Sequence, residues 1–189
     1  MIPKMTWHVV QFKDVVPTPW RNGGGSTREL VAWPDSAAWR WRASLAEVTQ
    51  SGPFSDFTGV QRWFAVLKGD GVCLTVNGYM HMLSKSDQPL AFDGAAPTGC
   101  ELLGGTTRDF NLMVQDGTAA SVQRVFGSFH TTTSAPKIIA ACAHKKRAIV
   151  QIGTEKHELL PQTFGWAHVD ADVAVHVQSR DVLFLGIDV

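Results

Sequence analysis

Residues 62–78, RWFAVLKGDGVCLTVNG, decide the fold class of this chain. Two runs rich in β-branched and aromatic residues, 62–68 and 72–76, predict two β-strands. The glycine-rich turn Lys68-Gly-Asp-Gly71 joins them, and Asn77-Gly78 marks the next tight turn. The segment is therefore predicted to form part of a hydrophobic β-meander.

The same pattern of short strands continues on both sides of this segment, while helical periodicity is scarce and only a turn is expected near residues 34–38. Many short strands between Gly-rich turns predict an all-β sandwich or barrel. Residues 62–114 and 146–187 both show the meander pattern, which suggests a loose internal duplication joined by the Thr-, Ser- and Ala-rich stretch 127–146. Further strands are expected at 7–12, 27–33, 39–49, 109–114, 121–126, 148–151, 172–177 and 182–187.

Composition restricts the class of protein. The chain has 189 residues, 44% of them hydrophobic, and its formal net charge is zero, which argues against nucleic acid or an anionic membrane as the main partner. Three cysteines without paired spacing indicate reduced thiols. No apolar run approaches the ~20 residues that a membrane helix needs, and no signal-peptide pattern opens the sequence. We expect a soluble cytoplasmic protein.

Four stretches stand out from the strand background because they concentrate polar and charged residues. Strand parity places Asp109, Asn111 and Met113 on one face, and it puts Arg62 in line with Phe64. By the same alternation, Thr27, Glu29 and Val31 are expected to share a face. The four stretches are TPWRNGGGSTREL (18–30), WRWRAS (39–44), GPFSDFTGVQR (52–62) and GGTTRDFNLM (104–113).

In this order, the four motifs resemble the HutD/Ves family, named for a member encoded with the histidine-utilisation genes. The resemblance extends from about residue 7 to residue 115. It implies a cupin-like (RmlC-type) β-barrel, with one unit over 1–189 that is a bicupin of two halves, roughly 1–120 and 121–189. It also implies a small pocket and a role in tuning histidine catabolism. The pocket residues that it carries over are Trp20, Asn22, Gly23, Gly24, Thr27, Glu29, Arg42, Ser44, Phe57, Arg62, Asp109 and Asn111.

The residues themselves also favour a pocket. Glycines 23–25 let the backbone approach another group and leave amides free to point at it. Arg42 and Arg62 each lie beside an apolar strand face, where an unpaired charge is costly, so each needs an anion. Glu29 and Asp109 are one source of that anion, and a ligand carboxylate gripped by an arginine fork is the other. We favour the ligand because the polar groups come from four separate segments.

Neither a metal nor a cofactor is expected. Most metal-binding cupins use a His-x-His pair followed by a Glu, and the stretch that should hold the pair, residues 59–71, contains no histidine. The seven histidines are scattered without ligand spacing. Glu29 and Asp109 are a possible acid/base pair if burial raises one pKa, but carboxylates paired to arginine give the same pattern. We assign no catalytic residue.

The sequence therefore predicts a metal-free protein that binds a small carboxylate metabolite, with N-formylglutamate and urocanate as the candidates. Arg42 or Arg62 would grip the carboxylate, and Trp20 would close one side of the pocket. An isomerase or hydrolase using Glu29 or Asp109 is one alternative, and an interaction protein of the same pathway is the other. The paired tryptophans at 39 and 41 hint at a homodimer.

Overall fold

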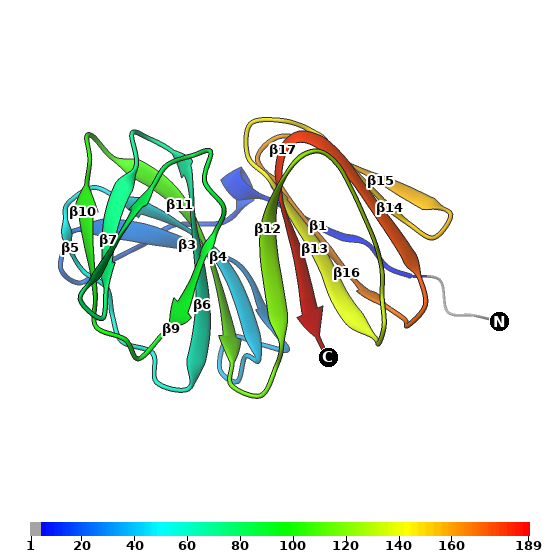
Figure 1. The fold of residues 1–189 in the computed structure, drawn as a ribbon, viewed down its shortest axis with the longest axis horizontal. Coiled ribbons are helices and arrows are strands. Elements are labelled where there is room, and N and C mark those ends of the chain that lie inside the picture. Colours follow the sequence, from blue (N-terminus) through cyan, green and yellow to red (C-terminus); the bar gives the residue numbers. More distant parts are fainter. Residues whose placement is uncertain (1–4) are drawn as a thin grey trace. The chain divides into compact units, whose positions relative to one another are not determined.

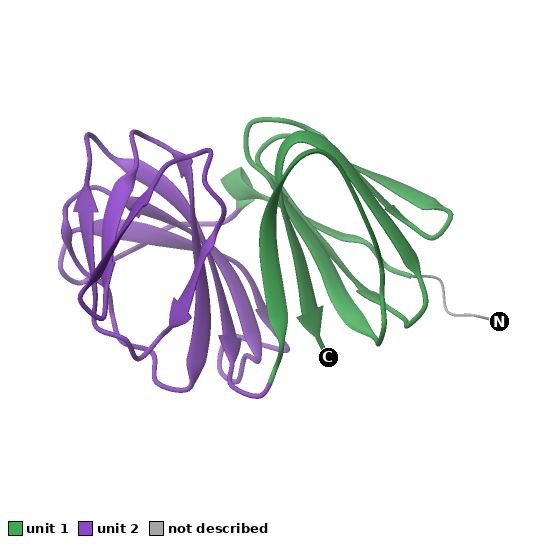
Figure 2. Cartoon of the chain, viewed as in Figure 1, with its two compact units in different colours: residues 1–14, 118–189 green, residues 15–117 purple. Residues whose placement is uncertain are grey.

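The computed structural model describes residues 5–189, and these residues form an all-β protein in which the single helical element is the 3-10 turn η1 (Phe12–Asp14). The chain divides into two compact units (Figure 2). The central unit is Val15–Gly117, and the terminal unit combines the N-terminal segment up to Asp14 with Thr118–Val189. Within residues 5–189, no helix is long and apolar enough to cross a membrane.

Two antiparallel sheets form the central unit (Figure 1). One has the order β2-β3-β4-β11-β6-β9, and the other has the order β5-β10-β7-β8. The strands are β2 (Thr18–Pro19), β3 (Gly25–Trp33), β4 (Trp41–Val48), β5 (Gly52–Pro53), β6 (Val60–Lys68), β7 (Val72–Val76), β8 (Tyr79–Leu83), β9 (Leu90–Asp93), β10 (Thr98–Leu102) and β11 (Thr107–Gln115).

The two strands predicted at residues 62–68 and 72–76 are confirmed as β6 and β7. They belong to different sheets, so the prediction that this segment is a meander is wrong. Gly69 and Gly71 adopt φ angles of 106° and 112°, which only glycine takes up without strain. A Cβ on Gly71 would lie 2.5 Å from the carbonyl oxygen of Leu83. Asn77 and Gly78 both have positive φ, as a two-residue hairpin turn requires.

On β4 and β6, the inward side chains are polar near one end of the strand and apolar along the rest of it. Phe64 and Val66 belong to the core cluster of the central unit, and Arg62 shares their face by parity. The residues predicted to point the opposite way on β11, Phe110 and Leu112, are fully buried as well.

A β-bulge interrupts the pairing of β3 with β4. Glu29 pairs with Ser44, while Val31 pairs with Ala43, so Leu30 is the extra residue. The bulge changes the side to which the following residues point. The expectation that Val31 shares a face with Thr27 and Glu29 is therefore wrong.

One seven-stranded sheet forms the terminal unit. Its order is β1-β16-β13-β17-β14-β15, and β12 also pairs with β17. The long strand β17 pairs with β13 through its C-terminal part and with β14 through its N-terminal part. The strands are β1 (His8–Gln11), β12 (Ala120–Thr132), β13 (Lys137–Ala143), β14 (Ala148–Ile152), β15 (Glu155–Leu159), β16 (Thr163–Val169) and β17 (Ala174–Asp188).

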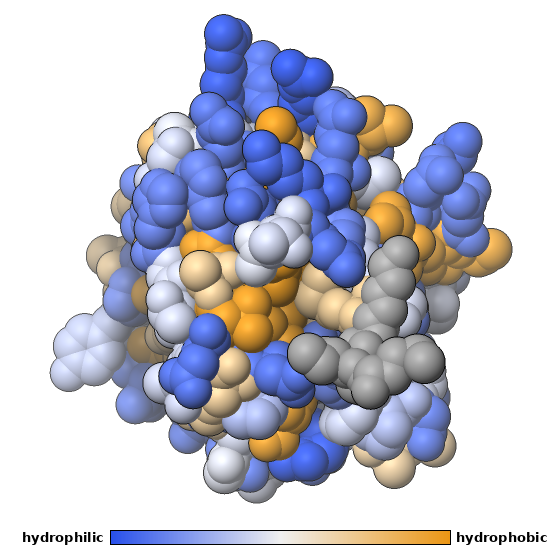
Figure 3. Space-filling view, turned by 90° about the vertical axis from the view of Figure 1, so that its right-hand side faces the viewer, coloured by the Kyte–Doolittle hydropathy of each residue, from blue (hydrophilic) through white to orange (hydrophobic). Residues whose placement is uncertain are grey.

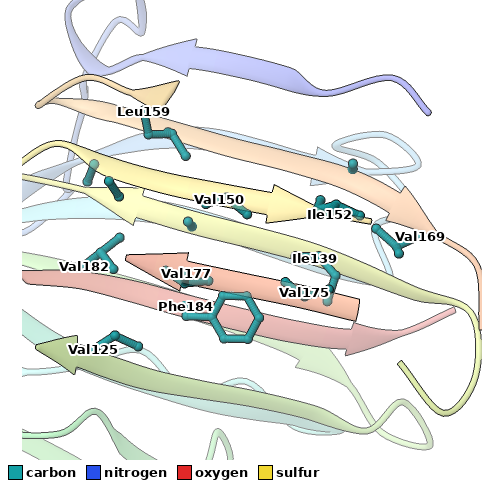
Figure 4. Close-up of a cluster of buried hydrophobic side chains, with 14 residues drawn as sticks. Val125, Ile139, Val150, Ile152, Leu159, Val169, Val175, Val177, Val182 and Phe184 are labelled. Atoms are coloured by element: carbon teal, nitrogen blue, oxygen red, sulfur yellow. The ribbon is translucent and has the colours of Figure 1, made fainter. Parts of the chain in front are cut away.

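The core cluster of the terminal unit consists of apolar side chains. Figure 4 shows valines, isoleucines and Phe184 from neighbouring strands turned toward a common interior. Met5, Trp7, Phe129 and Val173 pack against this cluster. In Figure 3, apolar surface gathers in a hollow at the centre of the face shown, with hydrophilic residues around it.

Three expectations need correction. The stretch 127–146 is not a connecting segment, because it contains the second half of β12 and the whole of β13, a strand of small and β-branched side chains that are almost all buried. The strands expected at 172–177 and 182–187 form one strand, β17. The division predicted near residue 120 lies close to the unit boundary at Gly117, but the N-terminal segment up to Asp14 belongs to the other unit, in which β1 pairs with β16. The description of the two units as two cupin halves stays a prediction.

Leu159 and Leu160 provide a matched test of the terminal core. Leu159 is fully buried in the cluster and its neighbour is 60% exposed. We expect Leu159→Ala to lower the free energy of unfolding by about 2–5 kcal/mol, because it leaves a cavity. Leu160→Ala should change it by less than about 0.5 kcal/mol. Urea unfolding of both variants measures the difference, and equal losses would contradict the assignment of this core.

Candidate functional site

A pocket of about 760 Å³ opens in the central unit, lined by residues of β2, β3, β4, β5, β6 and β11 and of the loops after β2 and β5. Its lining consists of Thr18, Pro19, Trp20, Arg21, Asn22, Thr27, Arg42, Ser44, Ala46, Pro53, Phe54, Ser55, Phe57, Arg62, Asn111 and Met113.

Most of the residues that the sequence singled out meet in this pocket, although they come from four separate stretches. Those that line it are Trp20, Asn22, Thr27, Arg42, Ser44, Phe57, Arg62 and Asn111. Those that do not line it are Gly23, Gly24, Glu29 and Asp109.

Strand register explains why the two arginines are brought together. Met113 on β11 pairs with Arg42 on β4 and with Arg62 on β6, so the three side chains form one row across the sheet. In the next row Asn111 pairs with Ser44. Residues from three strands that are far apart in the sequence thus share one inward face.

Arg62 is the most buried charge of the pocket, with 5% of its surface exposed. Its Nη2 donates to Oδ1 of Asn111 at 3.2 Å, and its Nη1 donates to the Ser55 carbonyl at 3.3 Å. Its Nε is buried and has no hydrogen-bond partner among the described residues. Burial, with the nearby charge of Arg42, lowers the pKa of Arg62 to about 10, so the guanidinium stays charged at neutral pH.

Three aromatic rings surround the Arg62 guanidinium. Its Cζ lies 5.0 Å from the ring centroid of Phe92, 5.3 Å from that of Phe54 and 5.4 Å from that of Phe57. Cation–π attraction of this kind contributes ~0.5–2 kcal/mol per ring. The rings partly offset the loss of hydration, but they supply no anion.

Arg42 differs from Arg62 because it has a carboxylate neighbour. Its Nη1 lies 3.7 Å from Oε2 of Glu29, and the two side chains are 22% and 36% exposed. Oε1 of Glu29 also accepts a hydrogen bond from Ser36. The Nε of Arg42 is buried without a hydrogen-bond partner in the described part of the chain. The internal ion pair expected for Glu29 therefore forms at Arg42 and leaves Arg62 uncompensated.

The glycine loop holds Trp20 rather than offering free amides. The Gly23 amide donates to the Trp20 carbonyl, and the Gly24 amide donates to Oδ1 of Asn22. The Trp20 indole donates to Oγ1 of Thr27 at 2.8 Å. A Cβ on Gly25 would lie 3.0 Å from the Trp20 ring and 2.3 Å from the Glu47 carbonyl oxygen. The prediction that the amides of Gly23 and Gly24 are free for a ligand is wrong, since the turn itself uses them.

Asp109 lies in the core and not in the pocket. Its side chain has no exposed surface, Oδ2 accepts a hydrogen bond from Thr107, and Oδ1 has no partner among residues 5–189. Burial raises the pKa of Asp109 from 3.8 to about 7, although the Thr107 hydroxyl opposes this shift. The expectation that Asp109 pairs with an arginine is wrong.

Several pocket residues were not predicted from the sequence. Phe54 and Ser55 lie within the stretch 52–62, but their roles, a ring and a carbonyl turned toward Arg62, depend on the path of the loop. Phe92, which lies beside Arg62 but does not line the pocket, was missed because β9 carries only a weak strand signal, and it reaches Arg62 by direct pairing. Met113 was recognised by parity but not as part of the lining.

The donor set of the pocket does not fit a cupin metal. Its polar groups are guanidinium ions, side-chain amides and hydroxyls, whereas such metals need neutral imidazoles and carboxylates. No group of three or more His, Cys, Asp or Glu side chains gathers anywhere in the described chain. The pocket is suited to an anion.

Comparison with known proteins identifies relatives over most of the chain. The HutD family model matches residues 12–185. An uncharacterised 21.2 kDa protein from the hutC 3′ region of Pseudomonas putida is 34% identical over 156 residues, which are 80% of this chain and 81% of that protein. Protein Ves of Cronobacter sakazakii is 36% identical over 127 residues, 65% of this chain and 70% of its own.

Solved structures agree with this relationship. A conserved protein of unknown function from Pseudomonas aeruginosa, PA5104, superposes with a TM-score of 0.85 at 28% identity, covering 97% of this chain and all of that one. HutD from Pseudomonas fluorescens superposes with a TM-score of 0.81 at 31% identity, covering 95% of this chain and 98% of that one. Oxalate decarboxylase of Bacillus subtilis superposes with a TM-score of 0.63 at 9% identity, and the match covers all of this chain and 78% of that one. This similarity concerns the fold alone. The predicted all-β, cupin-like fold is confirmed.

The buried carboxyl of Asp109 predicts an unusual dependence of stability on pH. Because its folded pKa of about 7 exceeds the value of 3.8 for a free side chain, the folded state binds the proton more tightly than the unfolded state. The stability that protonated Asp109 contributes is present below pH 4 and is lost as the pH rises toward 7. We expect Asp109→Asn to gain roughly 2–4 kcal/mol relative to wild type between pH 4 and pH 8.

Thr107→Val is the matched variant that should change the pH dependence of stability in the opposite direction to Asp109→Asn. It removes the donor to Oδ2 of Asp109, so the carboxylate becomes still less stable in the core and the loss of stability toward pH 8 should be steeper than in wild type. Denaturant unfolding across pH 4–8 measures both variants. Parallel pH profiles for the wild type and Asp109→Asn would show that this carboxyl does not titrate as described.

Proposed function

The chain belongs to the HutD family, and from this premise we propose that its central unit binds a small organic acid through a carboxylate. The observation that supports the proposal most directly is the charge of Arg62. This guanidinium is buried, carries an unpaired Nε, and lies within salt-bridge distance of no carboxylate in the described chain. An uncompensated buried charge is very costly. An anion that binds beside Arg62 would therefore stabilise the complex by compensating this charge.

Charge balance indicates what kind of acid fits. Arg42 and Arg62 contribute two positive charges, and Glu29 neutralises one of them. The inner pocket therefore matches one carboxylate, bound between two forks that can each make a bidentate contact. Arg21 is exposed at the rim and can meet a second carboxylate.

The rest of the lining suits a short, partly flat molecule. Trp20, Phe54 and Phe57 offer ring faces, while Asn22, Ser44 and Asn111 offer amide and hydroxyl groups. N-formylglutamate and urocanate both fit this description, the first as a dicarboxylate and the second as an acid on a planar ring. Since a P. putida relative is encoded in the hutC 3′ region, we propose that binding such an acid tunes histidine utilisation.

The cellular location of the protein is part of the same proposal. Cys73, Cys100 and Cys142 are free and buried, as in a reducing compartment, so we propose that the protein acts in the cytoplasm. The homodimer and the lack of a nucleic-acid partner stay predictions.

A catalytic role has less support than binding. Neither Glu29 nor Asp109 lines the pocket. Glu29 is engaged by Arg42 and Ser36, and Asp109 has no exposed surface. An acid/base mechanism that uses Glu29 or Asp109 requires that carboxylate within hydrogen-bond reach of the bound molecule, and neither side chain lines the pocket.

Arg62→Met tests the proposal by thermal shift. Methionine keeps an apolar stem among Phe54, Phe57 and Phe92 and removes the charge, so the free variant should be at least as stable as wild type. We expect N-formylglutamate or urocanate at 100 times its Kd to stabilise the wild type by ~2.7 kcal/mol. In Arg62→Met the affinity should fall at least about 30-fold, and the rise in Tm should disappear.

Arg108→Met is the control, because Arg108 is on the same sheet but pairs with Glu47 outside the pocket. It should keep the full ligand-induced shift. NMR of the mixture after incubation shows whether the acid is consumed, which would indicate turnover. A panel of acids that raises no Tm, or a shift that Arg62→Met retains, would rule out acid binding at this pocket and favour an interaction protein.

A further inference from the structure

Arg42 and Glu29 form a loose ion pair beside the acid pocket, the cavity of about 760 Å³ in the central unit. Arg42 lines this pocket and Glu29 does not. Nη1 of Arg42 lies 3.7 Å from Oε2 of Glu29, which exceeds hydrogen-bond range. Nε of Arg42 is buried and has no hydrogen-bond partner among the described residues. Glu29 therefore lowers the net charge at Arg42 without occupying the donors that a ligand would use.

The Glu29 carboxylate is held in place by a group other than Arg42. Ser36, in the loop between β3 and β4, donates its hydroxyl hydrogen to Oε1 of Glu29 at 2.6 Å. In the sheet Glu29 pairs with Ser44 on β4, and Arg42 lies two residues away from Ser44 on the same face. Glu29 is thus a diagonal neighbour of Arg42, which is within reach of a long side chain.

The Arg42 guanidinium also has contacts that do not involve Glu29. Its Cζ lies 5.5 Å from the ring centroid of Trp39 and 6.0 Å from that of Phe57. After burial, the charge of Arg42 is the second cause that lowers the pKa of Arg62. The two positive charges therefore act on each other, and Glu29 reduces their sum to one.

We propose, on the basis of the acid binding inferred above, that Glu29 is a specificity-determining residue of the acid pocket. It acts as a fixed counter-ion that makes the inner pocket prefer acids with one carboxylate to short acids with two.

The charges of the inner pocket explain this preference. The first carboxylate that binds beside Arg42 and Arg62 brings the net charge, with Glu29 included, to zero. A second carboxylate on a short acid would lose its water without meeting a free positive charge, and Glu29 would repel it. A neutral amide in the same position avoids both costs. A longer diacid avoids them when its second carboxylate reaches Arg21 at the exposed rim.

A purely structural role for the ion pair would have a different consequence. The two side chains are 22% and 36% exposed and share no hydrogen bond, so the pair contributes little to stability. Glu29→Gln keeps the shape of the side chain and an oxygen that can accept from Ser36. The Tm of the ligand-free variant should therefore stay close to that of wild type.

Calorimetric titration with succinate and succinamate at neutral pH and constant ionic strength tests the proposal. The two molecules differ only in that an amide replaces one carboxylate. We expect the wild type to bind succinamate more tightly. At ~7 Å and an effective dielectric constant of about 50, removal of the Glu29 charge strengthens binding roughly fivefold for each unit of ligand charge.

In Glu29→Gln the affinity for succinamate should therefore rise about fivefold and that for succinate about 25-fold. Urocanate, with one carboxylate, should also gain about fivefold, so the test does not depend on the four-carbon probes alone. Glu29→Asp keeps the charge and should keep the wild-type ratio of affinities. Glu47→Gln is the matched control, because Glu47 pairs with Arg108 on the same sheet outside the pocket, and it should bind all three acids as wild type does.

An unchanged ratio of the succinate and succinamate affinities in Glu29→Gln, or no gain for urocanate, overturns the proposal and leaves acid binding intact. A Glu29→Asp variant that behaves like Glu29→Gln also overturns it, because charge would then not be the cause. If the wild type binds none of these acids, acid binding at the pocket itself fails and the role of Glu29 fails with it.

Discussion

The burial of the Arg62 guanidinium without a carboxylate is the constraint around which the central unit is organised. A charged group that loses most of its water must recover the lost free energy from hydrogen bonds, ring faces or an anion. The protein supplies the first two through Asn111, Ser55 and the rings of three phenylalanines. It supplies Glu29 to the neighbouring Arg42 instead. The Nε of Arg62 has no hydrogen-bond partner among residues 5–189, so the described side chains do not fully compensate this charge.

Strand alternation lets the same sheet contain a pocket and an apolar core. On β6 the inward face carries Arg62 and then Phe64 and Val66, and the last two belong to the core cluster. On β4 it carries Arg42 and Ser44 and then Ala46 and Val48. Each strand therefore changes from polar to apolar along its inward side. The pocket forms at the polar end, and the cluster below it fixes the strands that position the two arginines.

The sequence contained enough information for the fold class and for most of the pocket lining, because both depend on period-two alternation. Parity groups Asn111 with Met113 and places Arg62 in line with Phe64, and Asn111, Met113 and Arg62 all line the pocket. Alternation fails where the count of residues changes: Leu30 forms a bulge, which turns Val31 to the other side. Parity also says only which face a side chain takes and not how deep it lies. Asp109 shares a strand with Asn111, but it lies in the core and Asn111 in the pocket.

Contacts that depend on pairing between distant strands could not be read from the sequence. Phe92 reaches Arg62 because β9 pairs with β6, and His130 reaches His176 because the long strands β12 and β17 run side by side. Histidines that look scattered along the chain become neighbours once the register is known. The two units consequently place their chemistry differently. The central unit directs charge inward, while the terminal unit fills its interior with apolar side chains.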